Sequence, residues 1–199
     1  MITLLYVYFG VIGEELHLHS NGIDFSRISE KHIPTETSIA KSQILLRDYS
    51  IDEIPIILLG HTEEVCYRLR MQKKLARTIH LSIGSSKGYD GGFRKTHTFN
   101  RPTNLTVDIY HVCTYYLHTL YTGEPIRTVS ISLTNLVAEG EEQISLFDNV
   151  IQREKEMRLT RVMDEIRTRF SKNSILWGVS YTKNATARYR NTLLGGHKS

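Results

Sequence analysis

Several short stretches of the chain alternate apolar and polar residues, which is the period of a half-buried β-strand. The clearest is segment 78–83, where every second residue is isoleucine or leucine and the others carry hydroxyl or imidazole groups. Segment 126–135 repeats this pattern with serine and threonine on its polar side. Segment 37–46 ends in three apolar residues, and segment 93–101 is an unusually polar strand after a glycine-rich turn. The pattern therefore predicts four strands.

Apolar residues at helical spacing predict two helices between these strands, over 62–76 and 105–121. Thr62 is expected to cap the first helix, and Glu63 and Glu64 would then lie favourably at its positive N-terminal end. A third helix is predicted over roughly 150–170. Its apolar stripe is explained by core packing and consists of Leu159, Val162, Met163, Ile166 and Phe170.

The predicted order of elements in the central region is β-α-β-β-α-β. This order is typical of an α+β, ferredoxin-like fold, in which a four-stranded antiparallel sheet carries both helices on one face. With 199 residues, the chain is long enough for one such domain with appendages, and a second full domain is not expected.

Cysteine usage and the N-terminal sequence indicate a cytoplasmic protein. Cys66 and Cys113 lie in apolar-periodic stretches without a ligand spacing, so we expect reduced core residues. Segment 1–13 is apolar but lacks a basic start and is too short to span a bilayer, which requires about 20 apolar residues. No membrane association is therefore predicted.

Basic residues concentrate in two regions. From His61 to Pro102 there are nine basic and three acidic residues, and from Ile166 to Ser199 there are seven basic residues and no acidic one. A polyanion such as nucleic acid is the simplest partner for this distribution, although a solvated surface explains the charge equally well. The basic segment 188–198 is either a second nucleic-acid contact or a frayed end.

The face of the sheet that the helices leave open is the candidate binding surface. Short hydroxyl donors and cations on a rigid surface suit phosphate contacts, and few aromatic side chains are available to stack single-stranded bases. Duplex DNA is therefore favoured over single-stranded RNA, and a merely solvated face is the alternative. The candidate DNA-contacting residues are His80, Ser82, Ser86, Lys87, Arg94, Lys95, Thr96 and Thr98, beside the hydroxyls of Thr128, Ser130 and Ser132.

No catalytic or metal-binding pattern is recognisable in the chain. His17 and His19 are two residues apart, which places their rings on different sides of a helix, and His111 and His118 lack partners at ligand spacing. No phosphate-binding loop or Ser-His-Asp arrangement is found. On these residues the chain is predicted to bind rather than to catalyse, with neither a catalytic residue nor a metal site.

Three motifs together carry a resemblance to a known family, namely FGVIGEELHLHSNGID near the N-terminus, QISLF after the last strand and RYRNTLLGGHK at the C-terminus. The chain resembles the C-terminal part of Y-family, UmuC-type translesion DNA polymerases of Gram-positive bacteria. The resemblance implies a protein of DNA repair and the SOS response to DNA damage. It divides the chain into a thumb remnant (1–24), a linker (25–36), a little-finger domain (37–137), a clamp-binding segment (138–149) and a helical, basic tail (150–199).

The resemblance also implies a partner for QISLF. In the family such a peptide inserts its Leu and Phe into an apolar pocket of the replication sliding clamp, which suits two large apolar side chains between acidic neighbours. The alternative is that these side chains pack on the protein's own core. The candidate clamp-binding residues are Gln143, Ile144, Leu146 and Phe147.

Family polymerases begin with palm and fingers domains, whose carboxylates bind two Mg²⁺ ions. No such part is recognisable in this chain, so we expect no cofactor and no polymerase activity from it alone. One hypothesis is a module that binds damaged or primer-template duplex DNA and the clamp. The alternative is the C-terminal half of a split polymerase, completed by a separate palm and fingers chain. An RNA-binding ferredoxin-like module is a weaker possibility.

Overall fold

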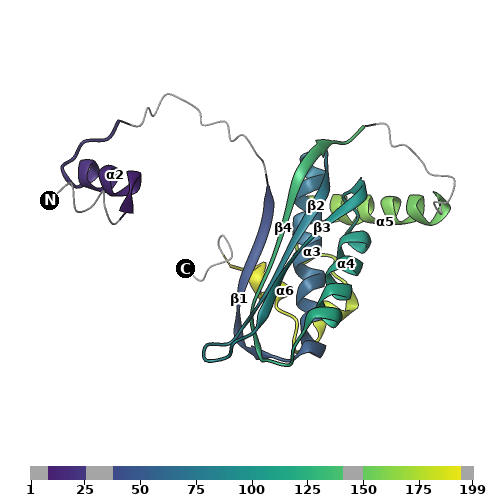
Figure 1. The fold of residues 1–199 in the computed structure, drawn as a ribbon. Helices are drawn as coiled ribbons and strands as arrows, with labels where there is room; N and C mark the ends of the chain where they lie inside the picture. The colour runs from purple at the N-terminus through teal and green to yellow at the C-terminus, as the bar shows by residue number, and fades with distance from the viewer. Residues whose placement is uncertain (1–8, 26–37, 141–149, 194–199) are drawn as a thin grey trace. The chain divides into compact units, whose positions relative to one another are not determined.

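The computed structural model describes residues 9–25, 38–140 and 150–193 (Figure 1). The chain forms two compact units, residues 1–35 and 36–199. In the described part of the first unit, helix α2 (Val11–Ser20) follows Gly10, whose φ is 59°. Asn21 caps the C-terminal end of the helix, and the next residue, Gly22, has a φ of 72°. Positive φ angles of this kind favour glycine.

The second unit holds the predicted sheet, with strand order β1-β4-β2-β3 and antiparallel pairing throughout. In each β-α-β unit another strand therefore lies between the two connected strands. This arrangement confirms the α+β fold with a four-stranded antiparallel sheet. The elements are β1 (Ile39–Tyr49), η1 (Ile51–Glu53), α3 (Ile54–Met71), β2 (Lys74–Ser85), β3 (Gly92–Thr103), α4 (Thr106–Leu120), β4 (Ile126–Ala138), α5 (Val150–Arg169), η2 (Gly178–Tyr181) and α6 (Ala187–Arg190).

Helices α3 and α4 cover one face of the sheet and contact each other, as Figure 1 shows. The core lies between these two layers. The inward residues of the central strands are at most 2% exposed: Ile79, Leu81 and Ile83 on β2, and Val129, Ile131 and Leu133 on β4. Full burial of one such side chain contributes about 1.5–3 kcal/mol, so the alternating pattern read from the sequence accounts for this layer.

Helix α3 begins earlier than predicted. Ser50 and Glu53 form a capping box ahead of it, in which the Ser50 backbone N–H donates to Glu53 Oε2 at 3.1 Å, and Pro55 occupies the first turn. Thr62 is buried in mid-helix, and its hydroxyl donates to the Leu58 carbonyl at 2.7 Å. The expected cap at Thr62 is therefore wrong, because a stronger start signal lies more than two turns upstream, at Ser50 and Glu53.

The predicted core stripe of α5 is also wrong in most of its members. Met163 is 7% exposed, but Leu159, Val162 and Phe170 are 50%, 52% and 66% exposed, and Ile166 is half-buried. The helix uses a neighbouring, more polar face for packing. Three of its large apolar side chains, Ile151, Leu159 and Val162, are exposed.

Candidate nucleic-acid interface

The open face of the sheet carries polar side chains in register across three strands. Because directly paired residues of antiparallel strands share a face, every outward residue of β2 has an outward neighbour on β3 and on β4. Three rows result: Ser130, Ser82 and Arg94; Ser132, His80 and Thr96; and Thr134, Thr78 and Thr98. The rows bring together five predicted residues, His80, Ser82, Arg94, Thr96 and Thr98.

His80 on β2 forms side-chain hydrogen bonds to both neighbouring strands, β3 and β4. Its Nδ1 lies 2.9 Å from Thr96 Oγ1, and its Nε2 lies 2.9 Å from Thr134 Oγ1. A neutral imidazole has one N–H and one lone pair, so one threonine hydroxyl accepts from the ring and the other donates to it. Asn135 Nδ2 in turn donates to Thr78 Oγ1 at 2.9 Å. The hydroxyls of Thr96, Thr134 and Thr78 are therefore held in position by hydrogen bonds.

Arg94 supplies the positive charge on the open face. It is exposed opposite Ser82, and within the described residues it forms no ion pair. Lys87 is exposed in the β2–β3 turn, beyond the end of the strand on which it was expected. Both cations are therefore available to an anionic ligand.

Lys95 lies on the other face, so its placement with the open-face residues is wrong. It pairs with the inward residue Leu81, and its Nζ lies 5.5 Å from the centre of the Tyr116 ring on α4. A cation over an aromatic ring is stabilised by the ring's electrons. Whether Lys95 contacts DNA stays a prediction, but Arg94 is the residue that the register places with His80 and Ser82.

Ser86 anchors the hairpin instead of lying exposed on β2. Its side chain is buried, its hydroxyl donates to the Asp48 carboxylate, and its backbone N–H donates to the Pro125 carbonyl at 2.9 Å. β2 ends one residue earlier, at Ser85. The expected exposure of Ser86 is wrong because this hydroxyl is already used within the domain.

The open face changes character at its β1 edge. Ile44 pairs with Thr128 and is exposed, as is Leu46, so of the apolar run 44–46 only Leu45 enters the core. Thr128 in turn leaves room only for a glycine opposite it, since a Cβ on Gly84 would lie 2.2 Å from Thr128 Oγ1. The polar part of the face therefore spans β4, β2 and β3.

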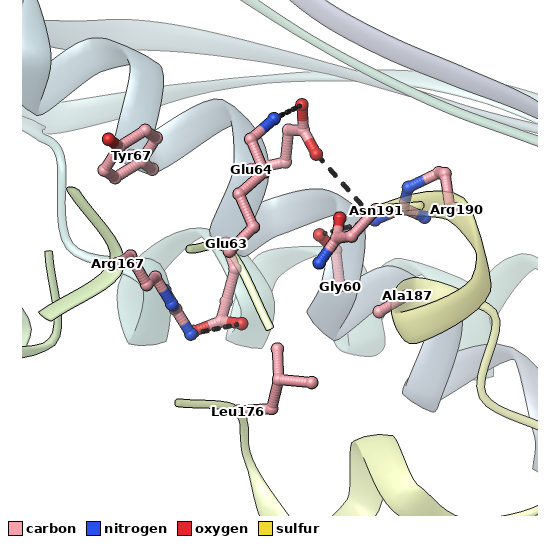
Figure 2. Close-up of a pocket in the computed structure, with 10 residues that line it drawn as sticks. Gly60, Glu63, Glu64, Tyr67, Arg167, Leu176, Ala187, Arg190 and Asn191 are labelled. Atoms are coloured by element: carbon pink, nitrogen blue, oxygen red, sulfur yellow. Dashed lines mark hydrogen bonds and ion pairs between the residues drawn. The ribbon is translucent and has the colours of Figure 1, made fainter. Parts of the chain in front are cut away.

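Two C-terminal arginines are bound to α3 rather than exposed. Figure 2 shows Arg167 against Glu63, with Nη2 3.0 Å from Oε1, and Arg190 near Glu64, at 4.0 Å. The Trp177 indole Nε1 also donates to Glu63 Oε1, at 2.7 Å. Sequence reasoning missed these contacts, because Glu63 was interpreted as part of a helix start.

The side-chain oxygen of Gln43 on β1 joins α3 and the C-terminal segment. Gln43 Oε1 accepts from His61 Nε2 at 3.0 Å, from Arg190 Nη1 at 3.1 Å and from Thr186 Oγ1 at 3.2 Å. His61 is fully buried, and among the described residues Nδ1 of its ring has no hydrogen-bond partner. Burial, reinforced by the charges of Arg190 and Lys41, holds the pKa of His61 well below its usual value.

Comparison with known proteins identifies the family. Residues 36–146 match the impB/mucB/samB family C-terminal domain. The chain belongs to this family. It is 42% identical over 200 residues to UvrX of Bacillus subtilis, named for UV-damage repair, covering 100% of this chain and 48% of UvrX. The predicted resemblance to the C-terminal part of UmuC-type, Y-family polymerases is thereby confirmed.

Two further relatives of this chain are, like UvrX, proteins of Bacillus subtilis. DNA polymerase IV 2 is 32% identical over 199 residues, covering 98% of this chain and 48% of the relative. The DNA repair protein homolog YobH is 42% identical over 125 residues, covering 62% of this chain and 58% of the relative. The chain therefore spans about half the length of the curated relatives it matches.

Among solved structures, the chain is similar to one titled as a complex of the beta-clamp processivity factor and the little finger domain of PolIV. That similarity covers 56% of this chain and 100% of the other, with 16% identity and a TM-score of 0.42.

The clamp-binding residues expected of a family member, Gln143, Ile144, Leu146 and Phe147, lie outside the described residues. Within the described ranges, no group of three or more histidine, cysteine or acidic side chains could hold a metal ion. No helix in these ranges is both long and apolar enough to cross a bilayer.

Proposed function

We propose that the chain binds duplex DNA through the open face of its sheet and positions a repair polymerase on the primer-template. The observation that supports this most directly is the fixed array of hydroxyls around His80, with Arg94 beside it and Lys87 in the adjoining turn. Hydroxyls and guanidinium groups are common phosphate ligands, and such contacts position a duplex without reading its sequence. Family membership supports the same conclusion.

A duplex suits this face better than a single strand. The three rows contain no phenylalanine, tyrosine or tryptophan, while Phe93 and Phe99 of β3 pack toward the core. Recognition of single-stranded bases relies on exposed aromatic rings that stack on them. The surface therefore favours contacts with the sugar-phosphate backbone.

Adjacent residues on opposite faces provide a matched test. Duplex DNA affinity would be measured by fluorescence anisotropy at several salt concentrations for the parent, Arg94→Glu and Lys95→Glu. Each lost phosphate contact lowers the dependence of log K on log salt by about 0.9. We expect a weaker affinity and a smaller slope for Arg94→Glu, and a smaller effect for Lys95→Glu although its charge change is identical.

Circular dichroism of the three proteins would show whether each keeps its fold. Equal losses in both variants would indicate general electrostatic attraction rather than a defined face. An unchanged affinity for Arg94→Glu would place the DNA elsewhere on the protein.

We propose further that Gln143, Ile144, Leu146 and Phe147 bind the replication sliding clamp. The support is the sequence alone: a pair of large apolar side chains flanked by Glu141, Glu142 and Asp148. Calorimetric titration of the cognate clamp should give micromolar affinity, about −8 kcal/mol, and the Leu146→Ala, Phe147→Ala double variant should not bind. Equal binding by both proteins would contradict this role.

Polymerase chemistry is proposed to depend on palm carboxylates outside the described residues, in the same polypeptide or in a separate one. Nucleotide transfer requires carboxylates that hold two metal ions. We expect no nucleotide incorporation by this chain alone. Incorporation that survives repurification and is lost on substitution of an acidic residue of this chain would contradict the proposal.

A further inference from the structure

Helix α5 presents an apolar stripe that the described residues of its unit leave largely exposed. Ile151 is 83% exposed, and Leu159, Val162 and Phe170 are exposed beside it along the helix of 20 residues, about 30 Å. At 100° per residue these four side chains fall within one sector about 100° wide. Figure 1 shows the N-terminal end of α5 reaching beyond α4.

The face of α5 that adjoins this stripe is already in use. Arg70 donates to Asp164 from Nε to Oδ2 at 2.6 Å, and the Arg167–Glu63 pair and the buried Met163 lie on the same side. These contacts fix the rotation of the helix about its axis. Val162 and Ile151 are thereby kept exposed, while Leu159 borders a cavity that Leu59 and Trp177 also line.

The outward stripe is symmetric about a midpoint directly after Thr160. Leu159 and Val162 are equidistant from that point, and so are Ile151 and Phe170. A second, antiparallel α5 with the same midpoint would set Leu159 against Val162 of the second copy. It would also set Ile151 near Phe170 of the second copy at both ends. Such self-complementarity is what a two-fold interface between identical chains requires.

Charges beside the stripe follow the same symmetry. Lys155 would face Ile166 of the second copy, where its aliphatic stem can cover apolar surface while its ammonium reaches solvent. Arg158, which is 3.4 Å from Glu154 of its own helix, would also lie next to Glu165 of the second copy, and the two-fold axis repeats this contact. Opposite charges flanking an apolar seam set the orientation of paired helices, and these favour the antiparallel one.

We propose that two copies of this chain associate through their α5 helices, antiparallel, along Leu159 and Val162. The apolar seam is narrow and the flanking pairs are exposed, so the dimer is weak, of the kind that small interfaces form. This surface lies apart from the open sheet face and does not depend on the proposed function.

Sedimentation velocity of the full chain over a range of concentrations tests this proposal. The mass should rise from that of the 22.9 kDa chain toward twice that value. Val162→Glu should remain monomeric. Arg158→Glu should weaken the dimer, and adding Glu165→Arg should restore it, because the exchanged charges again attract. Recovery of the dimer in this double variant requires the antiparallel arrangement and would not follow from non-specific hydrophobic association.

Two control variants separate this interface from other exposed apolar surfaces. Leu16→Glu on α2 and Ile44→Glu on β1 each add one charge at an exposed apolar position and should leave dimerisation unchanged. The proposal is overturned if the parent stays monomeric up to about 100 μM, which would exclude even weak association. It is equally overturned if Leu16→Glu or Ile44→Glu abolishes the dimer while Val162→Glu retains it.

Discussion

The two basic regions of the chain use their cations in opposite ways. On the β2–β3 hairpin, Arg94 and Lys87 face outward and, among the described residues, form no ion pair. In the C-terminal segment, Arg167 is 8% exposed against Glu63, and Arg190 is buried against Gln43 and Gly60. The first region therefore offers charge to a ligand. The second region uses its charge to attach the C-terminal segment to α3.

The contrast shows that a count of basic residues does not locate a nucleic-acid surface. The C-terminal region has the stronger excess of positive charge in the sequence, yet two of its arginines are neutralised within the fold. Only cations that remain exposed can release counterions from DNA. Substitutions in the C-terminal segment should therefore change mainly the stability of the fold. Substitutions on the β2–β3 hairpin should change mainly the affinity for DNA.

The largest change in the free energy of unfolding is expected from loss of the Glu63 carboxylate. Glu63→Ala leaves the Arg167 guanidinium buried without its partner and removes the acceptor of the Trp177 indole. Breaking a buried pair in this way costs about 3–5 kcal/mol. Urea denaturation would measure the change.

The control for Glu63 is an exposed pair on α5. Glu154→Ala removes the partner of Arg158 at 3.4 Å and should change the free energy of unfolding by less than about 0.5 kcal/mol. If both variants changed the free energy of unfolding by similarly small amounts, the Glu63–Arg167 pair would be solvated. The C-terminal arginines would then not attach their segment to α3 as described.

An intermediate effect is expected from His61 when the pH is lowered. The pKa of His61 is depressed in the folded chain, so the unfolded chain binds a proton first as the pH falls below about 6.5. Stability is then lost by up to about 1.4 kcal/mol per pH unit, until the folded-state pKa is reached. Thermal unfolding of the parent and of His61→Gln between pH 7 and 5 should show a steeper dependence for the parent. Parallel curves would contradict the burial of a neutral ring.

The smallest effect is expected for an exposed cation of the C-terminal segment. Lys172 is 3.6 Å from Glu64 and largely exposed. Lys172→Gln should change the free energy of unfolding by no more than about 0.5 kcal/mol. The salt dependence of duplex binding should also stay the same, in contrast to Arg94→Glu. A loss of slope comparable to that of Arg94→Glu would extend the DNA-binding surface to the C-terminal segment.

The strands could be predicted from the sequence because their period of two is unambiguous wherever one face is apolar. The polar strand β3 was the exception, since nothing obvious fixed which of Arg94 and Lys95 points outward. A signal was present in Phe93 and Phe99, which share the odd-numbered positions with Lys95 and pack toward the core. The two aromatic residues set the phase of the whole strand.

The start of α3 was also readable, from Ser50 and Glu53 with the proline that follows. The attachment of the C-terminal segment to α3 could not be predicted from the sequence. Glu63 and Arg167 lie 104 positions apart, and nothing local in either segment indicates that they meet. The outward turn of the α5 stripe depends on the same distant ion pairs, so it too required the tertiary structure.

The shared acceptor at Gln43 has a consequence for how the domain assembles. Arg190 and Gln43 are 147 positions apart, so their contact closes a long loop, and it can form only after β1 and α3 have brought Gln43 and His61 together. We therefore expect the C-terminal segment to dock late in folding. Substitutions there should act chiefly on the rate of unfolding and leave the rate of folding almost unchanged, so this segment governs the lifetime of the native state.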